Sequence, residues 1–291
     1  MFWNRVTSLP RKRAVAIAGS LVIAGTLIPL GVATASASSA SATSASASTA
    51  AKPTIVLVHG AWADGSSWDG VTRILQDDGY TVDVAPNPLR GLTYDTAYLR
   101  DYLASISGPI VLVGHSYGGA VITDAATGNA NVKALVYDDA YLPALGENIT
   151  TLSTAQSALA PAVNNPASVF KLVQYPDPPA AGVVDTYLLP SVVAADFAPD
   201  VSPAEQALLT ATQSPTSLAA LMQPSTQPAW KTIPSWDVIG RQDKIIPEAA
   251  QLMMAHRAGS HITEINSSHV SLISHPGEVA AVILKAVDAT S

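Results

Sequence analysis

The sequence predicts an α/β fold: a doubly wound, mostly parallel sheet of about six strands, with a helical cap inserted after the fourth. Short β-branched apolar runs alternate with amphipathic segments, and glycine-rich turns separate them. This alternation stops between residues 141 and 228, where twelve of the 21 prolines fall. Strands that alternate with helices are joined by right-handed crossovers, so neighbouring strands are expected to run parallel.

The core elements are expected in two stretches, 54–140 and 229–291. The predicted strands are 54–59, 81–85, 110–113, 132–138, 235–240 and 262–266. The predicted helices are 68–78, 93–106, 119–127, 247–258 and 276–288. Ser66 or Ser67 is the expected N-cap of the first helix, and Gly79 is its expected end.

The insertion, residues 141–228, is interpreted as a cap or lid. It contains helix candidates such as 203–212 and no convincing buried strand. Ligands enter open α/β folds at the carboxyl edge of the sheet, and the insertion follows a strand at that edge. Loops of this length are usually functional, so a role over the site is favoured over a mere surface excursion.

The N-terminus is typical of an export signal. Residues 1–13 are basic, 14–32 are apolar without charge, and small-x-small cleavage sites follow at Ala33-Thr34-Ala35 and Ala35-Ser36-Ala37. We therefore predict a secretory signal peptide over 1–37 and a secreted, extracellular protein. An uncleaved membrane anchor is the alternative. Residues 38–53 are rich in Ser and Ala and predict a disordered linker.

Composition excludes several kinds of chemistry. Cysteine is absent, which excludes disulfides and thiol catalysis. The formal charge is −7, and removing the four basic residues of 1–37 leaves 11 basic against 22 acidic residues, or −11. Such a surface disfavours nucleic acid and, after signal cleavage, stable membrane association. No cofactor or metal is expected, because His256 and His261 lack a His-Glu-x-x-His pattern. The oligomeric state is left open.

The motif that carries chemistry is Gly114-His115-Ser116-Tyr117-Gly118. It matches Gly-x-Ser-x-Gly, in which a serine occupies a strained turn between a buried strand and a helix. Glycines on both sides allow the chain to pass closely. Ser116 is then exposed at the sheet edge, where the helix N-terminus stabilises developing negative charge. The motif predicts that Ser116 is a nucleophile.

A serine hydroxyl needs a base within hydrogen-bond reach and a carboxylate that orients the base. His269 follows the sixth predicted strand by three residues, and Asp243 follows the fifth. The chain order Ser, Asp, His agrees with the motif. Asp138 and Asp139 end the fourth strand, and Asp139 is the main rival to Asp243.

An oxyanion site needs two backbone donors. The amide of Tyr117, directly after the serine, is one candidate, and the amide of Ala61, in the turn after the first strand, is the other. Trp62, His115 and Tyr141 flank these turns and are the expected pocket residues. A core position is the alternative for Trp62.

Together these motifs make the chain resemble the α/β-hydrolase superfamily, closest to the plant-type methylesterase and hydroxynitrile lyase branch and its bacterial esterase relatives. The resemblance covers residues 54–140 and 235–288 and is carried by 59–62, 114–119, Asp243 and Ser268-His269. It implies a six-stranded parallel core without antiparallel N-terminal strands. It also implies the nucleophile, acid, base and oxyanion roles given above. Hydroxynitrile lyases of this branch carry a lysine directly after the histidine, whereas this chain has Val270, which favours ester hydrolysis.

The expected function is that of a secreted serine carboxylesterase, which hydrolyses small, fairly apolar esters through an acyl-enzyme. A lactonase, an amidase or a polyester hydrolase would use the same triad. A non-catalytic protein that binds small molecules on the same fold is an alternative from another class.

Overall fold

The computed structural model describes residues 52–175 and 182–290. The described residues all lie in the second of the chain's two units, Thr49–Ser291. The predicted signal peptide and almost all of the predicted linker lie outside the described residues. Within the described ranges, no helix combines the length and the hydropathy needed to cross a membrane.

A six-stranded parallel sheet forms the centre of the second unit, as predicted. Its strand order is β2-β1-β3-β4-β8-β9, and every neighbouring pair is parallel. The strands are β1 (Thr54–Val58), β2 (Thr81–Ala85), β3 (Ile110–His115), β4 (Val132–Asp138), β8 (Ser235–Gly240) and β9 (His261–Ile265). All residues of β3 and β8 are buried, while the edge strands β2 and β9 are half exposed. Central strands of a parallel sheet are covered on both faces, which explains their continuous apolar sequence.

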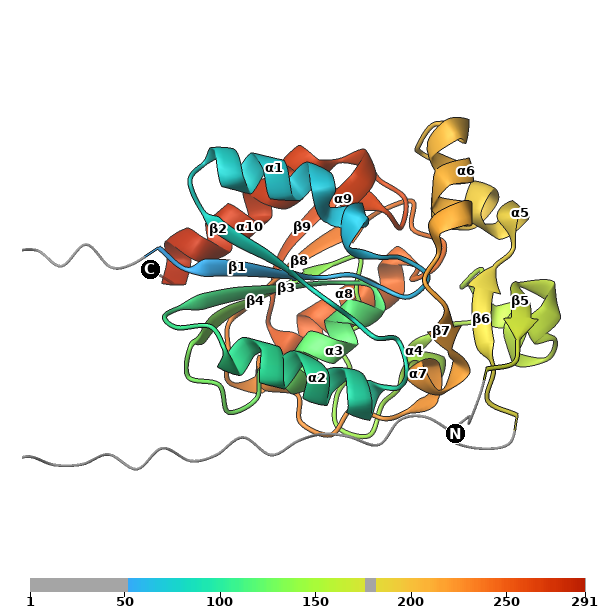
Figure 1. Ribbon diagram of the computed structural model, residues 1–291, viewed down its shortest axis with the longest axis horizontal. Coiled ribbons are helices and arrows are strands. Elements are labelled where there is room, and N and C mark those ends of the chain that lie inside the picture. The colour runs from blue at the N-terminus through green and yellow to red at the C-terminus, as the bar shows by residue number, and fades with distance from the viewer. Residues whose placement is uncertain (1–51, 176–181, 291) are drawn as a thin grey trace, which may run out of the picture. The chain divides into compact units, whose positions relative to one another are not determined.

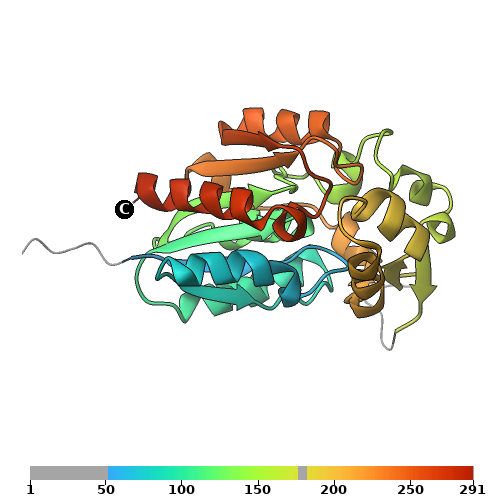
Figure 2. The ribbon, with the colours of Figure 1, turned by 90° about the horizontal axis from the view of Figure 1, so that it is seen from above.

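Helices cover both faces of this sheet (Figure 1). One face carries α1 (Asp69–Asp77) and α10 (Pro276–Thr290), which contact each other. The other face carries α2 (Leu92–Ala104), α3 (Tyr117–Ala125) and α8 (Glu248–Ala258). The view from above shows the described segments of the cap, 141–175 and 182–228, at one end of the sheet (Figure 2). The doubly wound arrangement is therefore confirmed.

The first helix begins differently from the prediction. A 3₁₀ turn, Gly65–Trp68, precedes α1; Asp64 is the N-cap of this turn, and the N-cap of α1 is Trp68, without a side-chain capping bond, rather than Ser66 or Ser67. The Asp64 carboxylate accepts a hydrogen bond from the Ser66 amide at 2.8 Å. Ser66 and Ser67 cannot cap α1 because the 3₁₀ turn that precedes the helix contains them, and the Asp64 carboxylate caps that turn.

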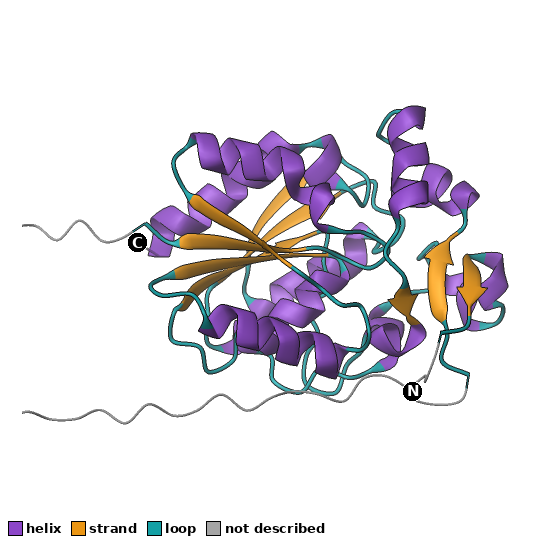
Figure 3. Cartoon of the chain, in the orientation of Figure 1, coloured by secondary structure: helices purple, strands orange, loops and turns teal. Residues whose placement is uncertain are grey.

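The cap is not purely helical, which corrects the prediction. It holds a three-stranded antiparallel sheet of β5 (Phe170–Val173), β6 (Asp185–Leu188) and β7 (Thr216–Ser217), shown as short strands in Figure 3. Its α-helices are α4 (Ile149–Leu152), α5 (Pro190–Val192), α6 (Pro203–Thr212) and α7 (Leu218–Met222). Strands of two to four residues are too short to produce a period-two pattern. Helix α6 has its predicted bounds.

Candidate active site

Ser116 occupies the turn between β3 and α3 in a strained conformation, with φ 52° and ψ −122°. Glycines make this turn possible. A Cβ on Gly114 would lie 2.7 Å from the carbonyl carbon of Gly118, and a Cβ on Gly118 would lie 2.6 Å from the Val58 carbonyl oxygen. Such distances leave no room for a side chain, so only glycine at these two positions lets the backbone segments approach as closely as predicted.

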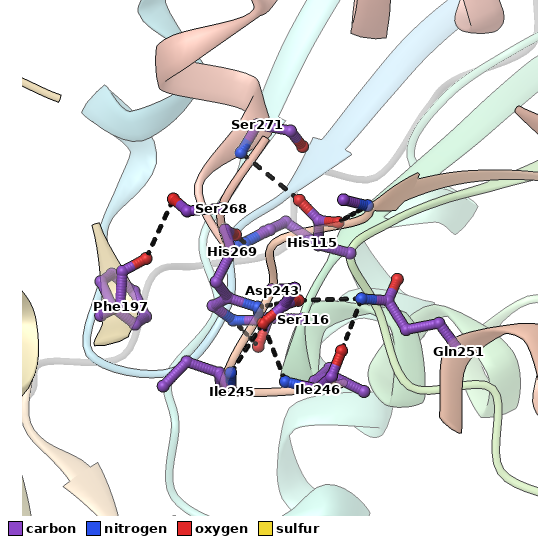
Figure 4. A network of polar contacts seen from close by, with 12 residues as sticks. His115, Ser116, Phe197, Asp243, Ile245, Ile246, Gln251, Ser268, His269 and Ser271 are labelled. Carbon is purple, nitrogen blue, oxygen red and sulfur yellow. Dashed lines mark hydrogen bonds and ion pairs between the residues drawn. The ribbon is translucent and has the colours of Figure 1, made fainter. Parts of the chain in front are cut away.

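Ser116, His269 and Asp243 form one chain of hydrogen bonds (Figure 4). The Ser116 Oγ lies 2.9 Å from Nε2 of His269, and Nδ1 of the same ring lies 2.7 Å from Oδ2 of Asp243. Because an ionised carboxylate can only accept, the network assigns the proton to Nδ1 and leaves Nε2 to accept from the serine hydroxyl. The structure thus brings the three predicted side chains together.

Asp243 is held by the loop between β8 and α8. Its Oδ1 accepts hydrogen bonds from the amides of Ile245 at 2.7 Å and Ile246 at 2.9 Å. Its Oδ2 accepts a third from the Gln251 side chain at 2.8 Å. Three donors of fixed position orient the carboxylate towards His269 and satisfy its charge although the residue is buried.

His269 is fully buried in the loop between β9 and α9 (Ser271–Ser274). Burial by itself lowers the pKa of the imidazole, but the charge and hydrogen bond of Asp243, with a smaller contribution from Asp139, outweigh burial. The net effect raises the pKa of His269 above 6.5. A raised pKa makes the imidazole a stronger proton acceptor.

The rival carboxylates have other partners. Oδ1 of Asp139 accepts from the Gly240 amide at 2.6 Å, and Oδ1 of Asp138 accepts from the Ser271 hydroxyl at 2.6 Å. No hydrogen bond among the described residues joins either carboxylate to His269. The geometry therefore pairs the imidazole with Asp243. The described residues also contain no cluster of three His, Asp or Glu side chains suited to a metal ion.

The two candidate oxyanion donors lie beside the serine in sequence or in space. Tyr117 is the first residue of α3. A Cβ on Gly60 would lie 2.7 Å from the Cβ of Ser116, so the loop that carries Ala61 passes directly alongside. Among the described residues, neither the Ala61 nor the Tyr117 amide donates a backbone hydrogen bond. Both amides thus remain available to a ligand.

Ser116 is only 3% exposed, whereas the elbow alone predicts an exposed hydroxyl. The loop after β1 packs against Ser116, and the cap covers His269, the hydrogen-bond partner of Ser116. The ring of Phe197, from the π-helical turn Val193–Phe197 of the cap, lies edge-on to the His269 ring with 5.2 Å between centroids. The site in this structure is therefore closed from solvent.

A cavity of about 680 Å³ lies in the cap. Its walls are mainly apolar and contain no charged side chain; they are Ile149, Thr150, Ser153, Thr154, Ala155, Leu159, Ala160, Ala162, Val163, Asn164, Pro166, Phe170, Leu218, Leu221 and Met222. None of the predicted pocket residues is among them.

Two of the predicted pocket residues adjoin this cavity. The Trp62 ring stacks on Phe170 at 5.3 Å, and the Tyr141 hydroxyl lies 3.0 Å from the Ser153 hydroxyl. The Tyr141 amide also donates to the Ser116 carbonyl at 3.2 Å, so Tyr141 connects the elbow to a cavity wall. His115 does not reach the cavity: its Nε2 lies 2.8 Å from the His269 carbonyl oxygen. Burial lowers the pKa of His115 well below 6.5, so the neutral ring donates to this carbonyl and holds the loop.

A contact from the cap to the loop that carries His269 was not predicted from the sequence. The Asp200 carboxylate accepts from both the amide of Ser268, at 2.8 Å, and its hydroxyl. Lys244, next to Asp243, donates to the Ala195 carbonyl at 2.8 Å. The segment 195–200 therefore contacts both loops that carry the predicted acid and base. No local pattern marks these residues, because their partners are tens of positions away.

Comparison with known proteins agrees with this architecture. Residues 55–282 match the alpha/beta hydrolase family. A "Carbendazim hydrolyzing esterase" of Nocardioides sp. is 35% identical over 111 residues, which cover 33% of this chain and 46% of that protein. The match thus spans less than half of that relative. An alpha/beta hydrolase of Aspergillus novofumigatus is 26% identical over 81% of this chain and 96% of its own length.

Solved structures share the fold. The crystal structure of polyneuridine aldehyde esterase has a TM-score of 0.65 at 19% identity and covers 81% of this chain and 99% of its own. A pyrethroid hydrolase from Sphingobium faniae JZ-2 has a TM-score of 0.65 at 22% identity, with coverages of 81% and 98%. Since the family match extends over most of the sequence, the chain belongs to the alpha/beta hydrolase family.

Proposed function

We propose that the protein is a secreted serine carboxylesterase that hydrolyses uncharged apolar esters through an acyl-enzyme. The observation that carries the proposal is the continuous Ser116–His269–Asp243 hydrogen-bond chain at the strained elbow. Two relatives, named as a carbendazim hydrolyzing esterase and a pyrethroid hydrolase, support ester hydrolysis. The intact chain of three groups favours catalysis over passive binding of a small molecule.

In the proposed reaction, Nε2 of His269 takes the hydroxyl proton as Ser116 Oγ attacks the ester carbonyl carbon. Asp243 stabilises the resulting imidazolium, and the amides of Ala61 and Tyr117 bind the oxyanion. His269 then gives the proton to the leaving alkoxide, and the acyl-enzyme remains. Water repeats the sequence: it loses a proton to His269, attacks the acyl carbon, and the proton returns to Ser116 as the acid departs.

The cavity in the cap defines the proposed substrate class. Its volume of about 680 Å³ lies within the range of small-molecule sites, and no charged group lines it. A charged acyl or alcohol group would lose hydration there without an ionic partner, which is costly. Trp62 and Tyr141 adjoin both this cavity and the elbow or its flanking loop. We therefore expect neutral esters with an apolar group to be preferred.

The test is the Ser116→Ala variant assayed with p-nitrophenyl butyrate. Loss of the nucleophile should lower kcat by about 10⁴-fold or more, because the remaining rate comes only from binding and the oxyanion donors. Ser105→Ala, an exposed serine at the end of α2, serves as the matched control and should keep wild-type activity. A fluorophosphonate probe should label the wild type and not Ser116→Ala. Wild-type activity in Ser116→Ala would contradict the proposal.

A panel of esters, lactones, amides and polyester fragments then separates the reactions that share this mechanism. A clear preference for amides or lactones would replace the carboxylesterase assignment. Secretion is tested separately by N-terminal sequencing of protein from the culture medium. A new N-terminus near residue 38 is expected, while an intact Met1 in the membrane fraction would contradict export with cleavage.

A further inference from the structure

Behind the proposed active site lies a second, buried carboxylate that the reaction does not use. Asp139 directly follows β4 and is 0% exposed. Its Oδ1 accepts from the amide of Gly240 at 2.6 Å, and its Oδ2 lies 3.4 Å from the amide of Ser271. Gly240 is the last residue of β8, where the loop that leads to Asp243 begins, and Ser271 is the first residue of α9, two positions after His269. One carboxylate thus contacts the backbone at one end of each loop.

The packing around this carboxylate is tight. A Cβ on Gly240 would lie 2.8 Å from Oδ1 of Asp139 and 2.8 Å from the Ser268 carbonyl oxygen, so the two loops approach each other here without space for a side chain. The backbone of Asp139 has φ 44°, in the left-handed region that few residues other than glycine adopt. Asp139 is therefore held in a strained conformation at the point where the two loops meet.

The charges around Asp139 come from three elements. Asp138 precedes it on β4, Asp243 faces it from the loop after β8, and His269 faces it from the loop after β9. Burial and the Asp243 charge raise the pKa of Asp139 to about 7, while the charge of His269 opposes this shift. Burial and Asp139 raise the pKa of Asp138 well above its usual range. Burying two neighbouring carboxyl groups lowers the free energy of unfolding, so their presence beside the site calls for an explanation.

We propose that Asp139 is a positioning residue of the hydrolytic site: its carboxylate fixes the Asp243 loop and the His269 loop in register and stabilises the protonated form of His269. This inference rests on the proposed esterase function. The Asp139 carboxylate makes two contributions: a hydrogen-bonded connection between the two loops and a negative charge near the imidazole. Two substitutions remove these contributions differently.

Asp139→Asn removes the charge and keeps an oxygen that can accept from Gly240. Because the pKa of Asp139 is itself about 7, only its ionised fraction stabilises the imidazolium, so removal of the carboxyl should move the acid limb of the kcat/KM profile to lower pH by a small amount. Asp139→Gly suits the positive φ and removes both connections. It should lower kcat by roughly 10- to 100-fold, because small displacements of catalytic groups have effects of this size. KM for p-nitrophenyl butyrate should stay within about threefold, because Asp139 does not line the cavity.

Asp237→Asn is the matched control. Asp237 is a buried acid of β8, and burial raises its pKa to about 7 as well. No hydrogen bond connects its side chain to either loop among the described residues, and one of its carboxylate oxygens has no partner there. This variant should change stability but leave kcat and the acid limb as in the wild type. If Asp139 had a merely structural role, its variants would behave in the same way: their stability would change, but kcat and the acid limb would not.

Circular dichroism and cooperative thermal unfolding first establish that each variant folds. Folded Asp139 variants with wild-type kcat and an unmoved acid limb would overturn the proposal, as would a kcat loss that Asp237→Asn shares. If Asp139→Asn does not fold, Asp139→Gly decides through kcat alone. A wild-type protein that hydrolyses no ester contradicts the proposed function instead. The rate of fluorophosphonate labelling of Ser116 then still reports whether Asp139 positions the base.

Discussion

Replacing Ser116 by glycine should abolish hydrolysis and yet give a more stable fold than replacing it by alanine. Both substitutions remove the hydrogen bond to His269, which contributes about 1 kcal/mol. Only glycine relieves the φ of 52° and ψ of −122°, a conformation that costs a residue with a side chain about 1–3 kcal/mol. Glycine loses about 0.5–1 kcal/mol of this gain through its more flexible unfolded state. The glycine variant should therefore be more stable than the alanine variant by about 0.5–2 kcal/mol.

Thermal and urea unfolding of the two variants measure this difference. For a folded unit of this size it corresponds to roughly 1–8 °C in Tm. The control pair is Ser105→Gly and Ser105→Ala, because Ser105 has an ordinary φ of −81°. There the order should reverse, with alanine the more stable variant. An alanine variant of Ser116 at least as stable as the glycine variant would refute the claim that the elbow stores backbone strain.

Three further predictions concern the groups around the site. Asp243→Asn should lower kcat by about 10³–10⁴-fold in steady-state assays, because His269 loses the acceptor that fixes its tautomer; a loss below tenfold would contradict this role. Asp237 has a folded pKa of about 7 against 3.8 when unfolded, so it favours folding at low pH and this contribution is lost as pH rises through 7. Urea unfolding should show that Asp237→Asn is stabilising at pH 8, by up to about 4 kcal/mol, and neutral at pH 4; equal effects at both pH values would argue against a raised pKa. Asp200→Ala should slow fluorophosphonate labelling several-fold by freeing Ser268, whereas Ser268→Ala should have little further effect in the double variant; additive losses would show that the two residues act independently.

Much of the parallel core could be predicted because turn residues flank its strands and its central strands are covered on both faces. Strands β2, β4 and β8 have their predicted bounds, since an apolar run and a flanking turn residue mark each end. Helix α3 begins at Tyr117, two residues before the prediction. The predicted helix begins at Gly119 and leaves Tyr117 and Gly118 in the turn, whereas the turn consists of Ser116 alone and both residues lie inside α3. The small size of Gly118 and Gly119 also allows the close approach of the chain at the ends of β1 and β4.

The site residues could be predicted from topology and not from geometry. In a parallel sheet all carboxyl ends share one edge, so residues that follow β3, β8 and β9 must lie near one another. Asp139 and Asp243 follow neighbouring strands and satisfy this condition equally. What distinguishes them is the set of donors around each carboxylate. The amides of Ile245 and Ile246 turn Asp243 towards the imidazole, a detail of loop conformation that no periodic pattern encodes.

The cap could not be predicted because long-range contacts determine its structure. Its strands pair residues that are far apart, and its attachment to the core depends on single bonds such as Trp62 Nε1 to Thr186 at 3.0 Å and Arg90 to Asp185 at 2.7 Å. The spacing of apolar residues depends only on the helix or strand to which they belong, so it cannot predict contacts between distant segments. The core needs a fixed geometry at the sheet edge, and local patterns specify it. The cavity, in contrast, is formed by cap segments, and contacts between distant residues determine how these segments are arranged.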